Sequence, residues 1–326
     1  MARASKAQGI SRRIRVLAVL AGLLAALPGG RAAAAEPAAC RAVRFAEVGW
    51  TDIAATTALA SRLFEGLGYR PETRLVTVPG AYAAMRAKRV DVFLGNWMPS
   101  MAADRQPFVD DGSVEVVGAN LEGAKFTLAV PVELYGAGLR TFADIARFRE
   151  PLQGRIYGIE PGNDGNRLIL EMIRTDMFGL SGFQLVETSE RGMLAHVEQA
   201  TQRGQPIVFL GWEPHPMNVM FRLRYLDGGD AVFGPNFGGA TVYTNVRAGY
   251  LRECPNAGRL VRNLRFTLGL ENTLMRMILF YGMDPAQAAE QWLRANAPVW
   301  TPWLEGVAAF DGRPGPDAVK AGLGLR

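Results

Sequence analysis

Only two cysteines and two histidines occur among the 326 residues. A transition-metal cluster built from the usual Cys and His ligands therefore has too few residues to form. No Gly-x-Ser-x-Gly, P-loop or dinucleotide-binding motif stands in a strand–turn–helix setting, and no nucleophile lies in a recognisable pattern with a base. We therefore expect a protein that is not an enzyme and that holds no metal and no cofactor.

An excess of basic residues is absent from most of the chain, although the formal net charge is +5. Six basic side chains and no acidic one lie in the first 35 residues, namely Arg3, Lys6, Arg12, Arg13, Arg15 and Arg31. The remainder has 30 basic and 31 acidic side chains. The basic patch that would indicate nucleic-acid binding is therefore missing.

Residues 1–35 have the three parts of a secretory signal peptide. A basic region is followed by an apolar run from Val16 to Pro28 and by small residues that suit cleavage near Ala35. The apolar run is about 13 residues long, which is short for a membrane span, so a membrane anchor is the weaker alternative. We expect a periplasmic protein, and the sequence leaves the export route open.

The two cysteines are Cys40 and Cys254. An even number of cysteines in an exported chain favours one disulfide. The alternative is a lipidated Cys40, but Glu36 and Pro37 separate Cys40 from the apolar run, and Cys254 would then lack a partner. We predict a disulfide that joins Cys40 and Cys254.

Short apolar runs alternate with amphipathic stretches along the chain. Strands are predicted at 42–48, 74–78 and 90–94, with helices at 52–67 and 82–88. The same alternation of strands and helices recurs later in the chain, with strands at 155–159, 184–187 and 207–210 and helices at 167–178 and 191–203. This alternation predicts an α/β fold with mainly parallel strands.

Two short motifs recur in the same order in the two halves of this pattern. Gly66-Leu-Gly-Tyr69 is matched by Gly179-Leu-Ser-Gly182, at an offset of 113 residues. Phe93-Leu-Gly-Asn-Trp97 is matched by Phe209-Leu-Gly-Trp212, at an offset of 116 residues. Similar offsets indicate two lobes built on one plan, and a single long domain is the alternative.

Further strands are predicted at 125–130 and 240–245, one after each half. We interpret them as two strands that cross between the lobes and form a hinge. The predicted organisation is a signal peptide at 1–35, lobe A at 36–128, lobe B at 129–239 and a return to lobe A at 240–326. Both cysteines then belong to the same lobe.

Ligands of open parallel sheets bind beyond the carboxyl ends of the strands. Four segments of this chain fall at such ends: Gly49-Trp50-Thr51-Asp52, Asn96-Trp97-Met98-Pro99, Pro161-Gly162-Asn163-Asp164 and Trp212-Glu213-Pro214. All of them except the third contain a Trp. We interpret the three Trp rings as walls of a cleft between the lobes. The alternative for each Trp is ordinary packing in a turn.

Aromatic walls suit either a cation or a sugar. A cation–π contact contributes roughly 0.5–2 kcal/mol, so several rings around one ammonium ion contribute a large share of the roughly 8 kcal/mol that micromolar binding requires. A sugar site needs several polar side chains for its hydroxyl groups, and the four segments offer few. A quaternary ammonium ligand is therefore favoured over a sugar.

Asp52 is a candidate for helix capping and for ligand binding. If Asp52 faces the cleft, its carboxylate repels the carboxylate of a zwitterion such as glycine betaine. Choline instead brings a hydroxyl group that can donate a hydrogen bond to Asp52. This difference favours choline as the ligand, with glycine betaine or another methylated amine as the alternative.

At these segments the chain resembles the substrate-binding proteins of choline and glycine-betaine ABC transporters, over nearly all of residues 41–310. The resemblance rests on Gly-Trp-Thr-Asp, Gly-Asn-Trp-Met-Pro and Leu-Gly-Trp-Glu-Pro-His-Pro-Met. It implies a type II periplasmic binding-protein fold that closes like a hinge, a monomer, and a transmembrane permease as partner. It also implies an aromatic box of Trp50, Trp97 and Trp212, with Asp52 and Asn163 at the hydroxyl end.

The family's fourth cage residue is a Tyr, and this chain has Phe126 at that position. A Phe ring still attracts a cation, but the contact made by the Tyr hydroxyl is lost. The remaining alternative is a secreted two-lobed hydrolase or lyase, for which Glu160 and Asp164 resemble an acid–base pair. We expect His196 on an exposed or half-exposed helix face, and packing roles for His215, Trp292, Trp300 and Trp303.

Overall fold

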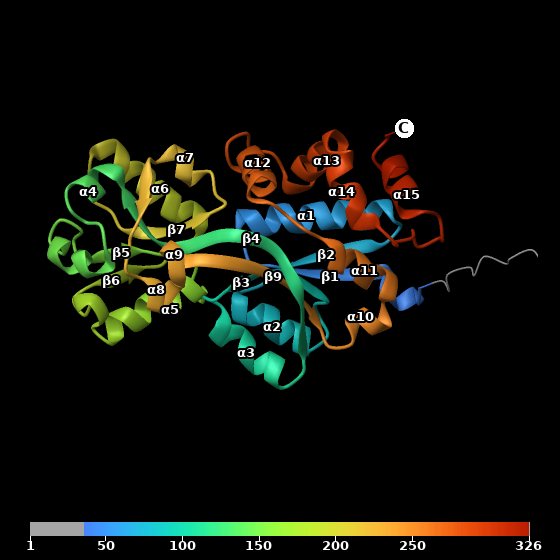
Figure 1. Ribbon diagram of the computed structural model, residues 1–326, viewed down its shortest axis with the longest axis horizontal. Coiled ribbons are helices and arrows are strands. Elements are labelled where there is room, and N and C mark those ends of the chain that lie inside the picture. The colour runs from blue at the N-terminus through green and yellow to red at the C-terminus, as the bar shows by residue number, and fades with distance from the viewer. Residues whose placement is uncertain (1–35, 326) are drawn as a thin grey trace, which may run out of the picture. The chain divides into compact units, whose positions relative to one another are not determined.

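The computed structural model describes residues 36–325 (Figure 1). The predicted signal peptide lies outside these residues. Among them, no helix is both long enough and apolar enough to cross a membrane. The described strands form one nine-stranded sheet in the order β2-β1-β3-β9-β4-β7-β5-β6, and the ninth strand, β8, pairs with β4.

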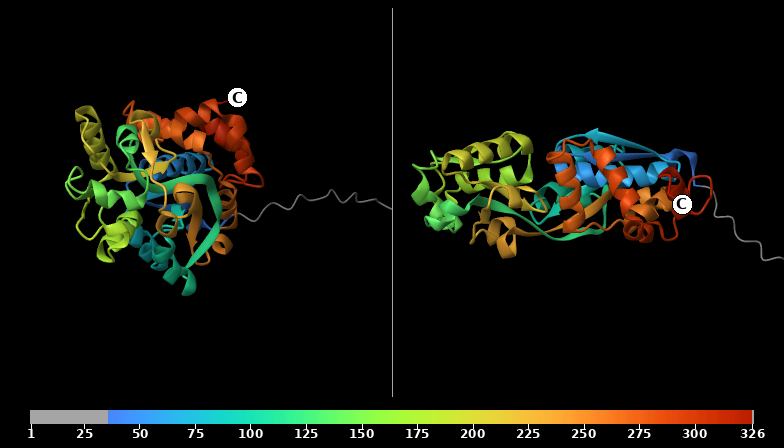
Figure 2. Two further views of the ribbon diagram at one scale, coloured as in Figure 1. Left: turned by 60° about the vertical axis from the view of Figure 1, so that its left-hand side comes forward. Right: turned by 90° about the horizontal axis from the view of Figure 1, so that it is seen from above.

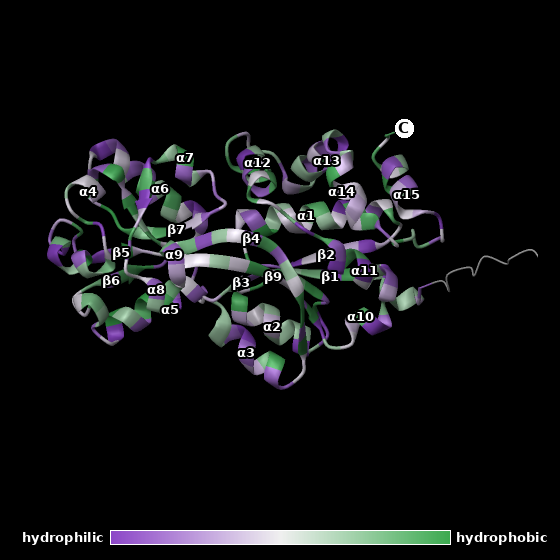
Figure 3. Ribbon diagram, viewed as in Figure 1, coloured by the Kyte–Doolittle hydropathy of each residue, from purple (hydrophilic) through white to green (hydrophobic). Residues whose placement is uncertain are grey.

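Three parallel strands open the chain, and we call them the first trio: β1 (Ala42–Glu47), β2 (Arg70–Leu75) and β3 (Val92–Met98). Figure 1 shows α1 on one side of these strands, with α2 and α3 on the other. These helices are α1 (Thr51–Gly66), α2 (Val78–Arg86) and α3 (Ala102–Asp110). The edge strand β2 is hydrophilic over most of its length (Figure 3) and is mostly exposed, as is usual where a sheet ends in solvent.

A second trio of parallel strands follows in the chain: β5 (Arg155–Tyr157), β6 (Gln184–Val186) and β7 (Phe209–Glu213). Its main helices are α5 (Asp164–Arg174) and α6 (Glu190–Arg203). In both trios the strand that comes first in the chain lies between the second and the third. This shared order supports the common plan inferred from the two motifs. We call the first trio with its helices lobe A and the second lobe B.

Two long antiparallel strands join the trios, namely β4 (Val114–Pro131) and β9 (Gly239–Arg247). Strand β9 pairs with β3 of the first trio, and β4 pairs with β7 of the second. Figure 2 shows the two strands running side by side between the lobes. Three register shifts interrupt their pairing, and such bulges bend a ladder. The two crossing strands are confirmed, while the predicted lobe boundaries fall in or beside them and stay a prediction.

The C-terminal part of the chain packs against lobe A through α12 (Leu268–Leu279), α13 (Pro285–Ala295) and α15 (Gly315–Gly322), which contact α1. Trp292 stacks on Trp303 with ring centroids 6.4 Å apart. The indole of Trp300 is fully buried and donates to the carbonyl oxygen of Leu293. The packing roles predicted for these three Trp residues are confirmed.

The remaining helices are short, apart from α11. They are α4 (Val132–Gly136), α7 (Met217–Met220), α8 (Asp230–Phe233), α9 (Pro235–Gly238), α10 (Tyr250–Glu253), α11 (Pro255–Asn263) and α14 (Ala297–Trp300). The 3₁₀ helices are η1 (Ala38–Arg41), η2 (Phe142–Phe148), η3 (Met177–Gly179) and η4 (Thr301–Leu304). Strand β8 spans Leu223–Tyr225.

Several predicted boundaries were wrong. The strand expected at 74–78 is β2, which begins at Arg70 and has given way to a helix by Val78. Trp97 and Trp212 lie near the ends of β3 and β7, not in the turns that follow them. Neither Thr51 nor Asp52 caps α1, because Trp50 occupies the N-cap position without a side-chain bond.

A disulfide joins Cys40 and Cys254, as predicted, with their Cα atoms 5.5 Å apart. Both side chains are buried, at 3% exposure. Cys40 lies in η1, and Cys254 separates α10 from α11. The bond closes a loop of more than two hundred residues, so it attaches the start of the described chain to its last third and limits the freedom of the unfolded chain.

Replacing both cysteines by serine should lower the free energy of unfolding by about 3 kcal/mol. The measurement is urea unfolding of the double variant Cys40→Ser/Cys254→Ser beside the oxidised wild-type protein. Reduced wild-type protein is the control and should behave like the variant. Three equal unfolding midpoints would show that the disulfide does not contribute to stability.

Candidate functional site

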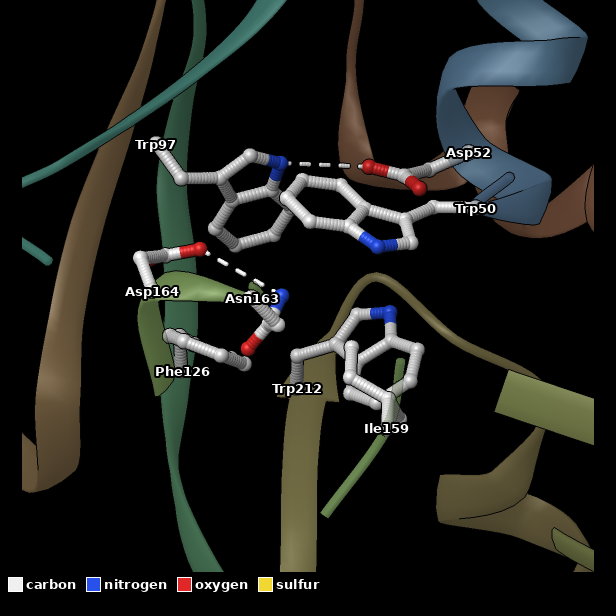
Figure 4. Close-up of a pocket in the computed structure, with 8 residues that line it drawn as sticks. All are labelled: Trp50, Asp52, Trp97, Phe126, Ile159, Asn163, Asp164 and Trp212. Carbon is white, nitrogen blue, oxygen red and sulfur yellow. Dashed lines mark hydrogen bonds between the residues drawn. The ribbon is translucent and has the colours of Figure 1, made fainter. Parts of the chain in front are cut away.

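A cavity with about 280 Å³ of empty space lies between the two lobes (Figure 4). Eight residues line it: Trp50, Asp52, Trp97, Phe126, Ile159, Asn163, Asp164 and Trp212. The structure thus brings together all six residues predicted to bind a ligand. The sequence analysis did not include Ile159 and Asp164 among them.

Each aromatic wall is held by a strand or by the start of a helix. Trp97 belongs to β3, Phe126 to β4 and Trp212 to β7, while Trp50 immediately precedes α1. Phe126 is the direct cross-strand partner of Trp212. Its ring centroid lies 6.4 Å from that of Trp212 and 6.1 Å from that of Trp97. All four rings are at least nine-tenths buried, so a ligand among them is removed from water.

The residues that line this cavity include neither Lys nor Arg. Lys125 precedes Phe126 in β4, and alternation along the strand points it to the other face. There its ammonium group lies 3.4 Å from the carboxylate of Glu213. The cavity therefore combines aromatic faces with acidic side chains, an environment that favours cations.

Asp52 extends from the first turn of α1 and is 2% exposed. The indole nitrogen of Trp97 donates to Oδ2 of Asp52 over 3.2 Å, whereas Oδ1 has no hydrogen-bond partner among residues 36–325. Burial, and to a smaller extent the nearby Glu190, raise the pKa of this carboxyl to about 7. Asp52 thus has a free acceptor oxygen, which a ligand can use.

Asn163 has a structural role in addition to its place in the cavity wall. Its side-chain oxygen accepts from the backbone N–H of Asn166 and caps α5. Its amide nitrogen donates to Glu160 over 3.3 Å. Because the cap fixes the orientation of the amide, the same nitrogen is also directed at Asp164, over 3.4 Å.

Two glutamates, the half-buried Glu160 and the buried Glu190, connect the lobes beside the cavity. Glu160, which follows β5, accepts from the indole nitrogen of Trp50 over 2.7 Å. Glu190, the first residue of α6, accepts from both the backbone N–H and the hydroxyl of Thr51, at 2.8 and 2.6 Å. The N–H of Thr51 is one of the donors that the start of α1 leaves without a helical partner. Glu190 therefore completes the N-terminus of a helix that belongs to the opposite lobe.

His215 holds Glu190 in place. Its Nδ1 accepts from the backbone N–H of Met217 at 2.9 Å, so Nε2 carries the proton and donates to Glu190 at 3.0 Å. The imidazole also packs edge-on against Trp212, with ring centroids 4.8 Å apart. His215 is thus more than turn packing, because it links a cavity wall to the contact between the lobes.

The sequence analysis missed the role of Glu190 and assigned no ligand to Asp164. Glu190 lies 139 residues from its partner Thr51, and no local pattern records such a pairing. Asp164 did have a signal, since it follows Asn163 in one of the four strand-end segments. Among residues 36–325 no group of three His, Cys, Asp or Glu side chains has the arrangement of a metal site.

The chain matches one family of known proteins and is similar to individual proteins. The family model described as "Substrate binding domain of ABC-type glycine betaine transport system" matches residues 41–295. An uncharacterised protein, ORF1, of Chromohalobacter salexigens is 57% identical over 40% of this chain and 83% of its own length. The glycine betaine/carnitine transport binding protein GbuC of Listeria monocytogenes is 31% identical over 50% of this chain and 53% of its own length.

Two solved structures are 56% identical to this chain and cover 88% of it and 100% of their own chains. The first is an ABC-transporter choline binding protein in complex with choline, with a TM-score of 0.87. The second is the unliganded protein in a semi-closed conformation, with a TM-score of 0.82. A glycine betaine/L-proline-binding protein of Borrelia burgdorferi, at 22% identity and a TM-score of 0.74, shares the fold over 80% of this chain and 96% of its own.

The buried acids predict that stability falls with rising pH. The pKa values of Asp52 and Asp164 are each raised by burial from 3.8 to about 7. Between about pH 4 and pH 7 the folded protein therefore holds protons that the unfolded chain has released, and its free energy of unfolding falls as the pH rises. Asp52→Asn should lose less stability than the wild type between pH 5 and pH 8.

Urea unfolding of both proteins at the two pH values measures this difference. The pKa values of Glu160 and Glu271 are also raised by burial, so the variant should keep part of the slope. Equal losses in the two proteins would show that Asp52 is already ionised in the folded state at pH 5.

Proposed function

Because the chain belongs to the family of substrate-binding domains of ABC-type glycine betaine transport systems, we propose that it is the choline receptor of an importer. It captures choline outside the cytoplasmic membrane, in the periplasm, and delivers it as a monomer to the transmembrane permease. Its role is binding and release, without chemical conversion. The observation that carries the proposal is a cavity lined by four aromatic rings, with an unpaired carboxylate oxygen and no basic side chain among its lining residues in the described chain.

The cage supplies most of the affinity. Each of the four rings contributes roughly 0.5–2 kcal/mol to a desolvated ammonium ion, and micromolar binding requires about 8 kcal/mol. Phe126 replaces the Tyr of the family's fourth wall, so this wall acts through its ring alone. Burial of the three methyl groups against the rings adds the hydrophobic part of the binding energy.

Asp52 selects choline within the methylated amines. Its Oδ1 accepts the hydrogen bond of the choline hydroxyl, while Oδ2 stays bound to the Trp97 indole. When Asp52 is ionised, a carboxylate in place of that hydroxyl would face it at short range in a dry site and be repelled. The choline complex of the 56% identical protein supports this assignment. The family description supports glycine betaine as the second candidate.

Binding and closure of the lobes are coupled. The cage takes Trp50 and Trp97 from lobe A and Trp212 from lobe B, so choline contacts both lobes fully only in the closed state. A ligand shifts such an equilibrium by its difference in affinity for the two states. Glu190 and Glu160 add hydrogen bonds to Thr51 and Trp50 in the same closed state. The receptor therefore holds its cargo when closed and releases it when the permease separates the lobes.

Asp52→Asn should weaken choline binding about tenfold and leave glycine betaine binding equal or stronger, because the variant loses one negative charge at the hydroxyl end. Intrinsic Trp fluorescence, titrated with choline and glycine betaine in parallel, measures both affinities. Wild-type protein that saturates with glycine betaine alone would overturn the choline assignment. An equal loss for both ligands in the variant would leave the selective role of Asp52 without support.

Glu190→Ala should weaken choline binding about tenfold, mainly through faster dissociation, because the closed state loses the bonds from Thr51 and His215. Stopped-flow fluorescence gives the dissociation rate. Glu198→Ala is the matched control, since Glu198 is an exposed residue of the same helix. If the two variants dissociate at the same rate, Glu190 does not stabilise the closed state.

A further inference from the structure

Asp164 is a second acidic residue in the wall of the cavity, and neither the family resemblance nor the first choice of ligand residues gave it a role. It is the first residue of α5, lines the cavity from lobe B and is 1% exposed. Its Oδ1 receives one long hydrogen bond, 3.4 Å, from the amide nitrogen of Asn163. Its Oδ2 is buried and has no hydrogen-bond partner among residues 36–325.

The cationic and polar neighbours of Asp164 make their hydrogen bonds mainly to other groups. Arg167, one turn further along α5, donates to Asp104 at 2.8 Å and to the backbone oxygen of Ser100 at 3.0 Å. The Ser100 hydroxyl donates to the backbone oxygen of Trp97 over 3.2 Å. It also lies close enough to Asp164 to lower the pKa of that carboxyl by hydrogen bonding, against the larger effect of burial, which raises it. Asp104 on α3 adds a like charge from the opposite lobe. Within the described chain Asp164 therefore has no ion pair.

A buried carboxylate with an unpaired oxygen is destabilising, because the group has left water without gaining a partner in return. The start of α5 offsets part of this cost, because a helix N-terminus favours a negative charge. Asp164 and Asp52 share the same features: each lines the cavity from the first turn of a helix, is almost completely buried and keeps one oxygen without a partner. A cation in the cavity supplies the missing compensation for both.

We propose that Asp164 is a second ligand-binding carboxylate, which together with Asp52 makes the cage selective for cations that carry no carboxylate of their own. This inference rests on the proposed function of the cavity. Asp52 extends from lobe A and Asp164 from lobe B, and Figure 4 shows the two carboxyl groups apart, one beside the Trp97 indole and the other beside the Asn163 amide.

Two separate carboxylates exclude a zwitterion in more than one orientation. With Asp52 alone, glycine betaine could turn its carboxylate away from lobe A and keep its ammonium group within the rings. Asp164 makes the lobe B side of the cavity acidic as well, so the turned ligand meets a second like charge in a dry site. Choline has no such conflict in either orientation.

The test compares Asp164→Asn with the wild-type protein and with Glu171→Gln. Glu171 is an exposed residue of the same helix, so its variant removes one negative charge at a distance from the cavity. Each protein is titrated with choline, tetramethylammonium and glycine betaine, followed by Trp fluorescence. Tetramethylammonium has no hydroxyl group and reports the charge alone.

Asp164→Asn should bind choline and tetramethylammonium about tenfold more weakly and bind glycine betaine as well as or better than the wild type, with Glu171→Gln unchanged. Unchanged binding of all three ligands by Asp164→Asn would overturn the inference, and so would an equal loss for all three, which would indicate a structural role. Wild-type protein that binds neither choline nor tetramethylammonium would instead refute the proposed function.

Discussion

The backbone pairing of β4 with β9 is the interaction on which the site depends. These two strands join parallel trios that are otherwise separate parts of the sheet, through pairing of β9 with β3 and of β4 with β7. The same ladders carry the walls of the cavity, because Phe126 lies opposite Trp212 and Trp97 lies opposite Val242. Since side chains alternate along a strand, a shift of one residue in either register would turn an aromatic wall to the other face.

The site also depends on acidic side chains that lie in or beside the cavity without basic partners there. Asp52, Asp164, Glu160 and Glu190 lie in or beside the cavity, and Arg167 and Lys125 are engaged with other acids outside it. Such an arrangement is unfavourable unless a positive charge compensates it. Under the proposed function a bound cation supplies this charge, whereas a ligand that brings its own negative charge does not.

The predictability of the fold varied with the kind of strand. The buried strands β1 and β3 gave apolar runs that could be located within a few residues. The edge strand β2 (Arg70–Leu75) has no apolar run, because it is exposed along most of its length and is held by its pairing with β1. Only the apolar end of the 18-residue strand β4 was recognised, because its first part is interrupted by bulges near Gly118 and Gly123.

The sequence by itself determined the types of residue at the strand ends, the internal repeat and the two cysteines, and these indicated an α/β protein with an aromatic cleft. These features are local or recur along the chain, so periodicity and motif spacing record them. The tertiary structure alone decided that Glu190 completes a helix of the opposite lobe, that His215 holds it, and that Asp52 and Asp164 each keep one free oxygen. These properties depend on which distant side chains remove a group from water or satisfy it, and no local pattern specifies that.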